Sequence, residues 1–247
     1  MATSSTSNST DRLYADTEAA PGSFVFDERV AEVFGDMIRR SVPGYGTVLA
    51  MSGVLARNHA RPGTVVYDLG CSLGAALAVM AEALPAGTCR LVGVDSSPAM
   101  IDKARRLLDE QGHQTVELHC ADIRDFPLAD ASMVVLNFTL QFLPPEQRLE
   151  LLRRIRKVLV PGGVLVLSEK IAGADPEEER LLTELHHQFK AANGYSRLEI
   201  ARKRTALEKV LVPETLATHR QRLEAAGFGR VDLWFRCFNF VSLLARP

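Results

Sequence analysis

A run of ten residues near the first quarter of the chain constrains the fold more than any other stretch. This run is Val65 to Gly74, and an extended stretch over residues 64–68 leads into a short turn with Gly70 and Gly74. Glycine lets the backbone turn sharply and approach a ligand closely because it has no Cβ. The helical pattern that opens at Leu73 would present unpaired N–H groups and a positive dipole end to an anionic group. The sequence therefore predicts a strand, a glycine turn and a helix that together bind a ligand.

Two acids extend this prediction to a nucleoside. The next strand, residues 90–94, ends in Asp95, and an acid in that place accepts hydrogen bonds from ribose hydroxyls. Apolar and polar residues alternate over 116–120, which predicts a third strand, and Asp122 follows where a carboxylate can take an adenine amino group. Strand, turn, helix, strand and acid in this order predict a nucleoside-binding α/β domain.

The remaining strands predict a doubly wound sheet. The apolar run 133–136 is typical of a strand buried on both faces, and it ends at Asn137. Residues 164–168 form a fifth strand, and the β-prone runs 231–235 and 238–244 form a terminal hairpin. We expect a Rossmann-like, mostly parallel sheet with an antiparallel C-terminal strand.

Helices are expected at both ends of this domain. Residues 23–60 predict two N-terminal helices, the first capped by Asp27 and the second running from Thr47 to Leu55, with Tyr45 in the loop between them. These helices would form either a lid over the ligand or a plain packing layer.

A helical arm is expected over residues 175–212. Its first part, from about Pro176 to Asn193, has one apolar face, whereas residues 195–209 are polar and basic with little apolar periodicity.

Composition limits the other possibilities. We interpret residues 1–22, which are rich in Ser and Thr, as a disordered tail, and residues 23–247 as a single domain. The tail has neither the basic nor the apolar region of a signal peptide, and no apolar run is long enough to span a membrane. The formal net charge of −1 gives no general attraction to nucleic acid or membranes. We therefore expect a cytoplasmic protein that binds neither.

No metal site is predicted. The four cysteines lie far apart without a C-x-x-C pair, and His186 and His187 point about 100° apart on a helix. The basic residues of the helix before the fifth strand lie opposite its apolar face, so a solvated face is favoured over a nucleic-acid patch. They are Arg153, Arg154, Arg156 and Lys157.

The glycine turn favours S-adenosylmethionine over a dinucleotide. Residues 68–74 have the sequence DLGCSLG and not G-x-G-x-x-G, which argues against a dehydrogenase. The turns Pro161-Gly162-Gly163 and Ala226-Gly227-Phe228 resemble those of the class I methyltransferase fold.

Longer blocks narrow this resemblance to one family. From about residue 24 to 244 the chain resembles carboxy-S-adenosyl-L-methionine synthases. The blocks are residues 26–34 (FDERVAEVF), 40–45 (RSVPGY), 133–142 (MVVLNFTLQF), 186–187 (HH), 192–196 (ANGYS) and 233–240 (LWFRCFNF).

The resemblance implies an unusual reaction. Members of this family convert S-adenosyl-L-methionine and prephenate into carboxy-S-adenosyl-L-methionine, phenylpyruvate and water. The sulfonium acidifies its own methyl group, prephenate supplies carbon dioxide as it aromatises, and the hydroxide that leaves is a possible base. The protein would then hold two charged molecules in a dry pocket, and no catalytic residue is assigned. The product serves a partner enzyme that modifies the wobble uridine of tRNA.

The resemblance also implies the residues that bind the nucleoside. Gly70, Cys71 and Ser72 would hold the methionine end, and Asp95 would bind the ribose with Ser96 beside it. Ser96 stands where a member of the family has asparagine, which affects only the details of that contact.

The remaining site residues follow in the same way. Asp122 and Ile123 would read the adenine, and Asn137 lies at the carboxyl end of the fourth strand, where open α/β sheets bind ligands. Tyr45 and Arg204 would hold the new carboxylate, for which the forked guanidinium is well suited. In the family this arginine comes from the neighbouring subunit, so the resemblance implies a homodimer.

Two alternatives remain open. The first is an ordinary methyltransferase that acts on a small molecule and releases S-adenosylhomocysteine. The second is a module that binds S-adenosylmethionine without catalysis.

Overall fold

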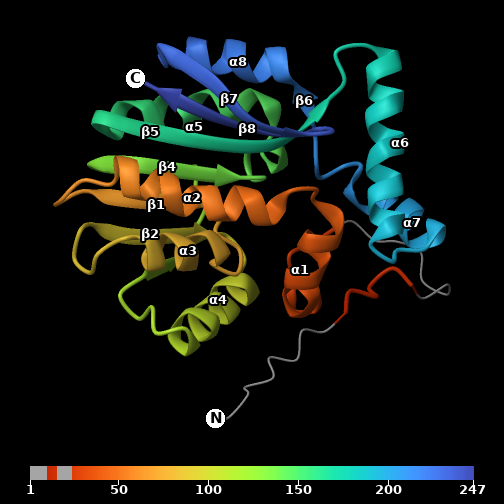
Figure 1. Ribbon diagram of the computed structural model, residues 1–247, viewed down its shortest axis with the longest axis horizontal. Coiled ribbons are helices and arrows are strands. Elements are labelled where there is room, and N and C mark those ends of the chain that lie inside the picture. The colour runs from red at the N-terminus through yellow and green to blue at the C-terminus, as the bar shows by residue number, and fades with distance from the viewer. Residues whose placement is uncertain (1–9, 16–23) are drawn as a thin grey trace.

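The computed structural model describes residues 10–15 and 24–247 (Figure 1). One sheet with the order β3-β2-β1-β4-β5-β8-β7 forms its centre, and β6 pairs with the end of β5. The pairs among β1 to β5 are parallel, whereas β8 runs antiparallel to both β5 and β7. The strands are β1 (Val65–Leu69), β2 (Arg90–Asp95), β3 (Glu117–Cys120), β4 (Ala131–Asn137), β5 (Leu159–Ala172), β6 (Glu214–Thr215), β7 (Arg230–Cys237) and β8 (Phe240–Arg246). The predicted doubly wound sheet with an antiparallel strand near its C-terminal edge is confirmed.

Helices cover both faces of this sheet. They are α1 (Glu28–Ser41), α2 (Tyr45–His59), α3 (Ala75–Ala83), α4 (Pro98–Glu110), α5 (Pro145–Val158), α6 (Pro176–Ala192), α7 (Arg197–Leu207) and α8 (Leu216–Ala225), with a short 3-10 turn at Leu140–Phe142. Successive β1 side chains enter two different cores, as alternation along a strand requires. Tyr67 packs with Ile155 of α5 and Leu223 of α8, whereas Val66 packs with Ala56 of α2 and Leu77 of α3.

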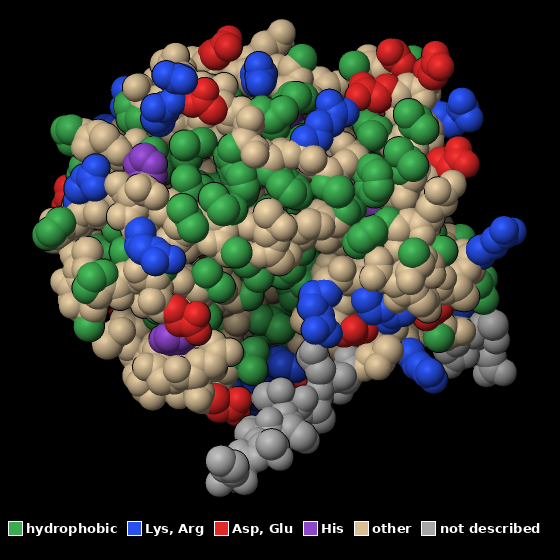
Figure 2. All heavy atoms as spheres, in the orientation of Figure 1, with side chains coloured by type: hydrophobic (Ala, Val, Ile, Leu, Met, Phe, Trp, Pro, Cys, Tyr) green, Lys and Arg blue, Asp and Glu red, His purple; other side chains and the backbone are tan. Residues whose placement is uncertain are grey.

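The arm stands beside the sheet. In Figure 1, α6 and α7 lie next to α1 at the end toward which the parallel strands point. Figure 2 shows hydrophobic side chains across the middle of this face of the molecule and charged groups of both signs around its edge. The arrangement puts the N-terminal helix α1 and the arm around the carboxyl ends of the strands, where open α/β sheets bind ligands.

The start of α2 differs from the prediction. The helix begins at Tyr45 and not at Thr47, because Gly44 takes the N-cap position with a φ of 74°. A Cβ at Gly44 would lie 2.3 Å from the Phe235 ring of β7, so the chain turns here through a space that only glycine fits. Tyr45 is therefore held on a helix and not in a loop.

Helix α7 lies within the predicted helical arm, although residues 195–209 have little apolar periodicity. Its buried positions are Ile200, Lys203 and Ala206, so a lysine occupies the stripe that would otherwise be apolar. The signal that the hydrophobic pattern lacks is present in the capping box, in which Ser196 and Glu199 each bond the other's backbone.

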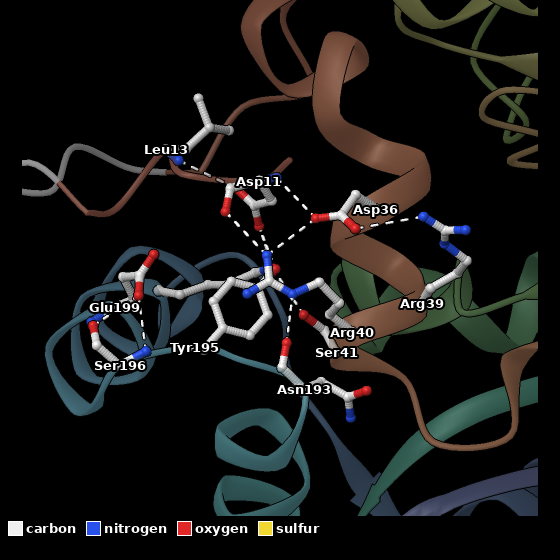
Figure 3. A network of polar contacts seen from close by, with 11 residues as sticks. Asp11, Leu13, Asp36, Arg39, Arg40, Ser41, Asn193, Tyr195, Ser196 and Glu199 are labelled. Atoms are coloured by element: carbon white, nitrogen blue, oxygen red, sulfur yellow. Dashed lines mark hydrogen bonds and ion pairs between the residues drawn. The ribbon is translucent and has the colours of Figure 1, made fainter. Parts of the chain in front are cut away.

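Residues 10–15 depart from the predicted tail. Asp11 is 1% exposed, its backbone N–H donates to Asp36 of α1 over 2.8 Å, and Tyr195 donates its hydroxyl to the Asp11 carboxylate (Figure 3). Arg40 also donates to the Asp11 carbonyl oxygen over 3.2 Å. These residues therefore belong to the folded domain, and the rest of the predicted tail lies outside the described residues.

Candidate functional site

A cavity of about 820 Å³ opens at the carboxyl ends of the central strands, between the sheet, α1 and the arm. Its lining includes all ten residues that the sequence analysis selected. They are Tyr45, Gly70, Cys71, Ser72, Asp95, Ser96, Asp122, Ile123, Asn137 and Arg204. Residues as far apart in sequence as Tyr45 and Arg204 therefore meet in one space.

The glycine turn is built as the sequence indicates. The N–H of Gly70 donates to the Val94 carbonyl over 2.7 Å, which fastens the turn after β1 to β2. Gly70 has a φ of +81°, and a Cβ there would lie 2.4 Å from the Thr139 side chain. Helix α3 begins at Ala75, with Gly74 at its N-cap. Burial raises the pKa of the Cys71 thiol, so Cys71 packs the turn as a neutral group.

Asp95 is held from both sides by backbone donors. One carboxylate oxygen accepts from the N–H of Ser72 and the other from the N–H of Ser97, each over 2.9 Å. Burial raises its pKa, and these backbone hydrogen bonds act in the opposite direction. The backbone N–H of Ser96 also acts on this carboxylate, and since an ionised carboxylate has about four acceptor sites, it can still accept a hydrogen bond from a hydroxyl group.

Asp122 is already paired within its own loop. Its carboxylate accepts from the Arg124 guanidinium, with one contact of 2.9 Å, and from the Arg124 backbone N–H over 2.8 Å. The Arg124 side-chain hydrogen bond is the main cause that lowers the pKa of Asp122. The carboxylate is therefore fixed in place and ionised at the rim of the cavity.

Two buried polar atoms in the lining lack partners among the described residues. Ser168 donates its hydroxyl to Asn137 Oδ1 over 2.8 Å, and this leaves the Asn137 amide nitrogen unpaired. Asp68 Oδ1 is likewise unpaired, and burial, together with the charge of Asp95, raises the pKa of Asp68 to about 7. Unpaired buried polar atoms are costly, so both point to a polar ligand with donor and acceptor groups. The site thus fits S-adenosylmethionine, which carries a sulfonium, an ammonium and a carboxylate.

The sequence analysis did not include Asp68 among the site residues. The signal was available, since Asp68 is the one acid inside the otherwise apolar strand β1. A charged residue in a strand buried on both faces is rarely placed there by packing alone.

Tyr45 and Arg204 reach the cavity from two different helices, α2 and α7. Tyr45 is half-buried in the first turn of α2, and its ring centroid lies 6.4 Å from that of Phe138. Arg204 is exposed on α7 and lines the cavity of its own chain. The resemblance placed this arginine in the site of a neighbouring subunit, and here a single chain already brings it to the rim.

The sequence analysis also missed the basic lining from β5 and α6. Lys170 and Lys190 both line the cavity, together with His186 and His187. His186 Nε2 lies 2.8 Å from the Ser41 carbonyl oxygen, and burial with nearby lysines lowers the pKa of His186 to about 2. His186 is therefore a neutral donor that ties α6 to α1.

Comparison with known proteins agrees with this geometry. Residues 66–163 match the protein family described as "Methyltransferase domain". The chain is 56% identical to the carboxy-S-adenosyl-L-methionine synthase of Trichlorobacter lovleyi over 238 residues, which cover 96% of this chain and 98% of that protein. The protein of the same name from Pseudomonas aeruginosa is 52% identical over 242 residues, 96% of this chain and 98% of its own. This chain belongs to the carboxy-S-adenosyl-L-methionine synthase family.

Solved structures support the fold of this synthase. An O-methyltransferase family protein from Burkholderia thailandensis aligns with a TM-score of 0.64 at 20% identity, over 90% of this chain and 60% of its own. Human N-acetylserotonin methyltransferase in complex with S-adenosylmethionine aligns with a TM-score of 0.58 at 19% identity, over 89% of this chain and 55% of its own. The predicted class I methyltransferase fold, the transferase class and S-adenosylmethionine as substrate are confirmed. Within residues 10–15 and 24–247, no helix of the synthase is long and apolar enough to cross a membrane.

Proposed function

We propose that this chain makes carboxy-S-adenosyl-L-methionine from S-adenosyl-L-methionine and prephenate, with release of phenylpyruvate and water. The observation that carries the proposal is its identity of more than 50%, over 96% of the chain, with synthases of that name. Neither an ordinary methyltransferase nor a binding module without catalysis gains support from these relatives.

The proposed reaction balances without an added oxidant or reductant. Prephenate loses carbon dioxide and its ring hydroxide and becomes phenylpyruvate. The methyl group of the sulfonium loses a proton, and the carbanion forms a carbon–carbon bond to the carbon dioxide. The proton and the hydroxide combine to water, so the protein supplies orientation and charge stabilisation.

Each wall of the cavity has a role in this proposal. Asp95 accepts from the ribose, and Asp122 with Ile123 reads the adenine. The turn from Gly70 to Ser72 holds the methionine end, together with Asn137. Support comes from the unpaired Asn137 amide and from the two backbone N–H groups that fix Asp95.

The new carboxylate is assigned to Tyr45 and Arg204. We propose a homodimer in which Arg204 serves the neighbouring site. Mixing Arg204→Ala subunits with Asp95→Ala subunits tests this arrangement. A site that takes Arg204 from its neighbour regains activity in the mixed dimer, because one site then has both residues. If Arg204 serves its own chain, every mixed site still lacks one of them and stays inactive.

We place the product in the cytoplasm as a carboxymethyl donor for an enzyme that modifies the wobble uridine of tRNA. In this proposal the synthase meets only small molecules and binds no nucleic acid. The net charge of −1 supports this view, since RNA binding draws on clustered positive charge.

Mass spectrometry tests the proposed function directly. Purified protein is incubated with S-adenosyl-L-methionine and prephenate, and the nucleosides and keto acids are analysed. We expect a nucleoside heavier than the substrate by one carbon dioxide, in equal amount with phenylpyruvate. S-adenosylhomocysteine formed with a methyl acceptor would favour the ordinary methyltransferase, and binding without turnover would favour the inactive module.

A further inference from the structure

The cavity has a basic side that the assigned roles leave unexplained. Lys170 of β5, Lys190 of α6 and the neighbours Lys203 and Arg204 of α7 all line it. Their charges act on one another: Lys203 and Lys170 both lower the pKa of Lys190, and Arg204 lowers that of Lys170. Three consecutive elements, β5, α6 and α7, thus bring cations together at one wall.

One of these cations has its counter-ion within the protein. Lys203 Nζ lies 3.5 Å from the Asp11 carboxylate and 3.0 Å from the Ser41 hydroxyl oxygen. Asp11 in turn accepts from Tyr195, and Figure 3 shows it enclosed by Arg40, Asp36 and the Tyr195 ring. Lys203 is therefore accounted for by a structural network.

Lys190 and Lys170 have no such partner. Lys190 is 7% exposed, and within residues 10–15 and 24–247 neither ammonium group has a hydrogen bond or an ion pair. The charge of Glu179 acts on Lys170, but the Glu179 oxygens accept from the Gly173 N–H over 2.6 Å and from the Thr183 hydroxyl over 3.1 Å. A buried ammonium without an anion is costly, and burial with its cationic neighbours lowers the pKa of Lys190 to about 7.

The end of helix α6 does not explain Lys190 either. A lysine in the last turn of a helix often bonds the free carbonyl groups there. In α6 these groups are already used, because the backbone N–H groups of Asn193, Gly194 and Tyr195 donate to the carbonyls of Phe189, Ala191 and Lys190. The Lys190 side chain is thus free to serve a ligand in the cavity that it lines.

We propose that Lys190, with Lys170 beside it, binds the carboxylate of the donor substrate that is not transferred. This inference rests on the proposed function, in which the donor is a dicarboxylate. One carboxylate of prephenate moves to the sulfonium methyl group, and the other remains on phenylpyruvate. Arg204 and Tyr45 are assigned to the first, so a second anion site is required, and the unpaired lysines supply it.

The charges of the cavity then sort the two substrates. Asp68 and Asp95, at the ends of β1 and β2, form an acidic side that suits the cationic groups of S-adenosylmethionine. Lys170 and Lys190 form a basic side that suits the dicarboxylate. Opposite charges at the two ends of the cavity would orient the two substrates so that their reacting carbon atoms face each other.

The test is calorimetric titration of prephenate into protein saturated with S-adenosylhomocysteine, which blocks turnover. We expect Lys190→Met to weaken the binding of prephenate at least tenfold. Lys170→Met should weaken this binding less, because Lys190 is the more deeply buried. The affinity for phenylpyruvate, which carries the retained carboxylate, should fall by the same factor. Binding of carboxy-S-adenosyl-L-methionine should change less than twofold in both variants. Lys157→Met, at an exposed position of α5, is the matched control and should change none of these affinities.

Each contrary result has a distinct meaning. Unchanged prephenate affinity in Lys190→Met overturns the inference, while wild-type turnover of prephenate would still support the proposed function. Loss of carboxy-S-adenosyl-L-methionine affinity with unchanged prephenate affinity assigns Lys190 to the transferred carboxylate and also overturns it. If wild-type protein neither binds nor converts prephenate, both the inference and the proposed function fail.

Discussion

The backbone N–H of Ser72 donates to the Asp95 carboxylate over 2.9 Å, so the glycine turn after β1 and the acid that ends β2 form one unit. Because one side chain holds the turn and, in the proposed function, also accepts from the ribose, a change in Asp95 would alter two parts of the site together. The same carboxylate also accepts from Ser97, whose hydroxyl caps α4.

Asp95→Asn is expected to weaken the binding of S-adenosylmethionine at least tenfold, which corresponds to about 1.4 kcal/mol of binding free energy. The amide has only one acceptor oxygen, so the N–H of Ser72 or of Ser97 loses its charged partner, and the ribose loses an acceptor. Isothermal titration measures the effect. Asp109→Asn, at an exposed position on α4, is the control, and equal affinity of both variants would contradict the role of Asp95.

Gly70→Ala is expected to destabilise the protein and to abolish tight binding of S-adenosylmethionine. A residue with a Cβ at a φ of +81° costs about 1–2 kcal/mol, and the added carbon would also meet Thr139 at 2.4 Å. Gly87→Ala separates the two effects, because Gly87 has a φ of +77° with nothing within 4 Å of its Cβ position. Thermal unfolding should show a larger loss of stability for Gly70→Ala. Identical losses in the two variants would mean that the Thr139 side chain moves aside without destabilising the protein.

Arg204→Ala should weaken carboxy-S-adenosyl-L-methionine at least tenfold and S-adenosylmethionine less than twofold. Only the first carries the additional carboxylate that a guanidinium would pair. Competition binding gives both affinities in one experiment. Arg197→Ala, at an exposed position near the start of the same helix, provides the comparison, and equal weakening of both nucleosides would remove Arg204 from the carboxylate site.

Glu169 makes the stability of the ligand-free protein depend on pH. It is 1% exposed, one oxygen accepts from the Leu140 N–H over 3.0 Å, and burial raises its pKa to about 8 from an ordinary value of 4.5. A raised folded-state pKa stabilises the protein fully below about pH 4.5, and this contribution is lost as the pH rises to about 8.

Glu169→Gln should remove this part of the pH dependence. Urea unfolding at about pH 5.5 and about pH 8.5 compares the two proteins, and the wild type should lose more free energy of unfolding between them. Parallel changes in both proteins would show that Glu169 is already ionised in the fold.

The sequence was sufficient to predict the elements that are determined by a local pattern of residues. The strand β1, the turn at Gly70 and the acid at Asp95 follow from a few adjacent residues, and the structure joins them as expected. Lys190 and Lys203 could not be foreseen in this way, because a charged residue on a helix usually faces water. Their burial depends on the packing of α6 and α7 against α1, which no local pattern contains.

Asp11 has a practical consequence for anyone who trims this protein for crystallisation. Judged by sequence, a shortened form that starts at Phe24 looks harmless, since it removes a Ser- and Thr-rich stretch. Such a form would lack the carboxylate that pairs with Lys203 and accepts from Tyr195. The ammonium group of Lys203 in the arm would then be a buried charge without its counter-ion. A shortened form should therefore retain Asp11.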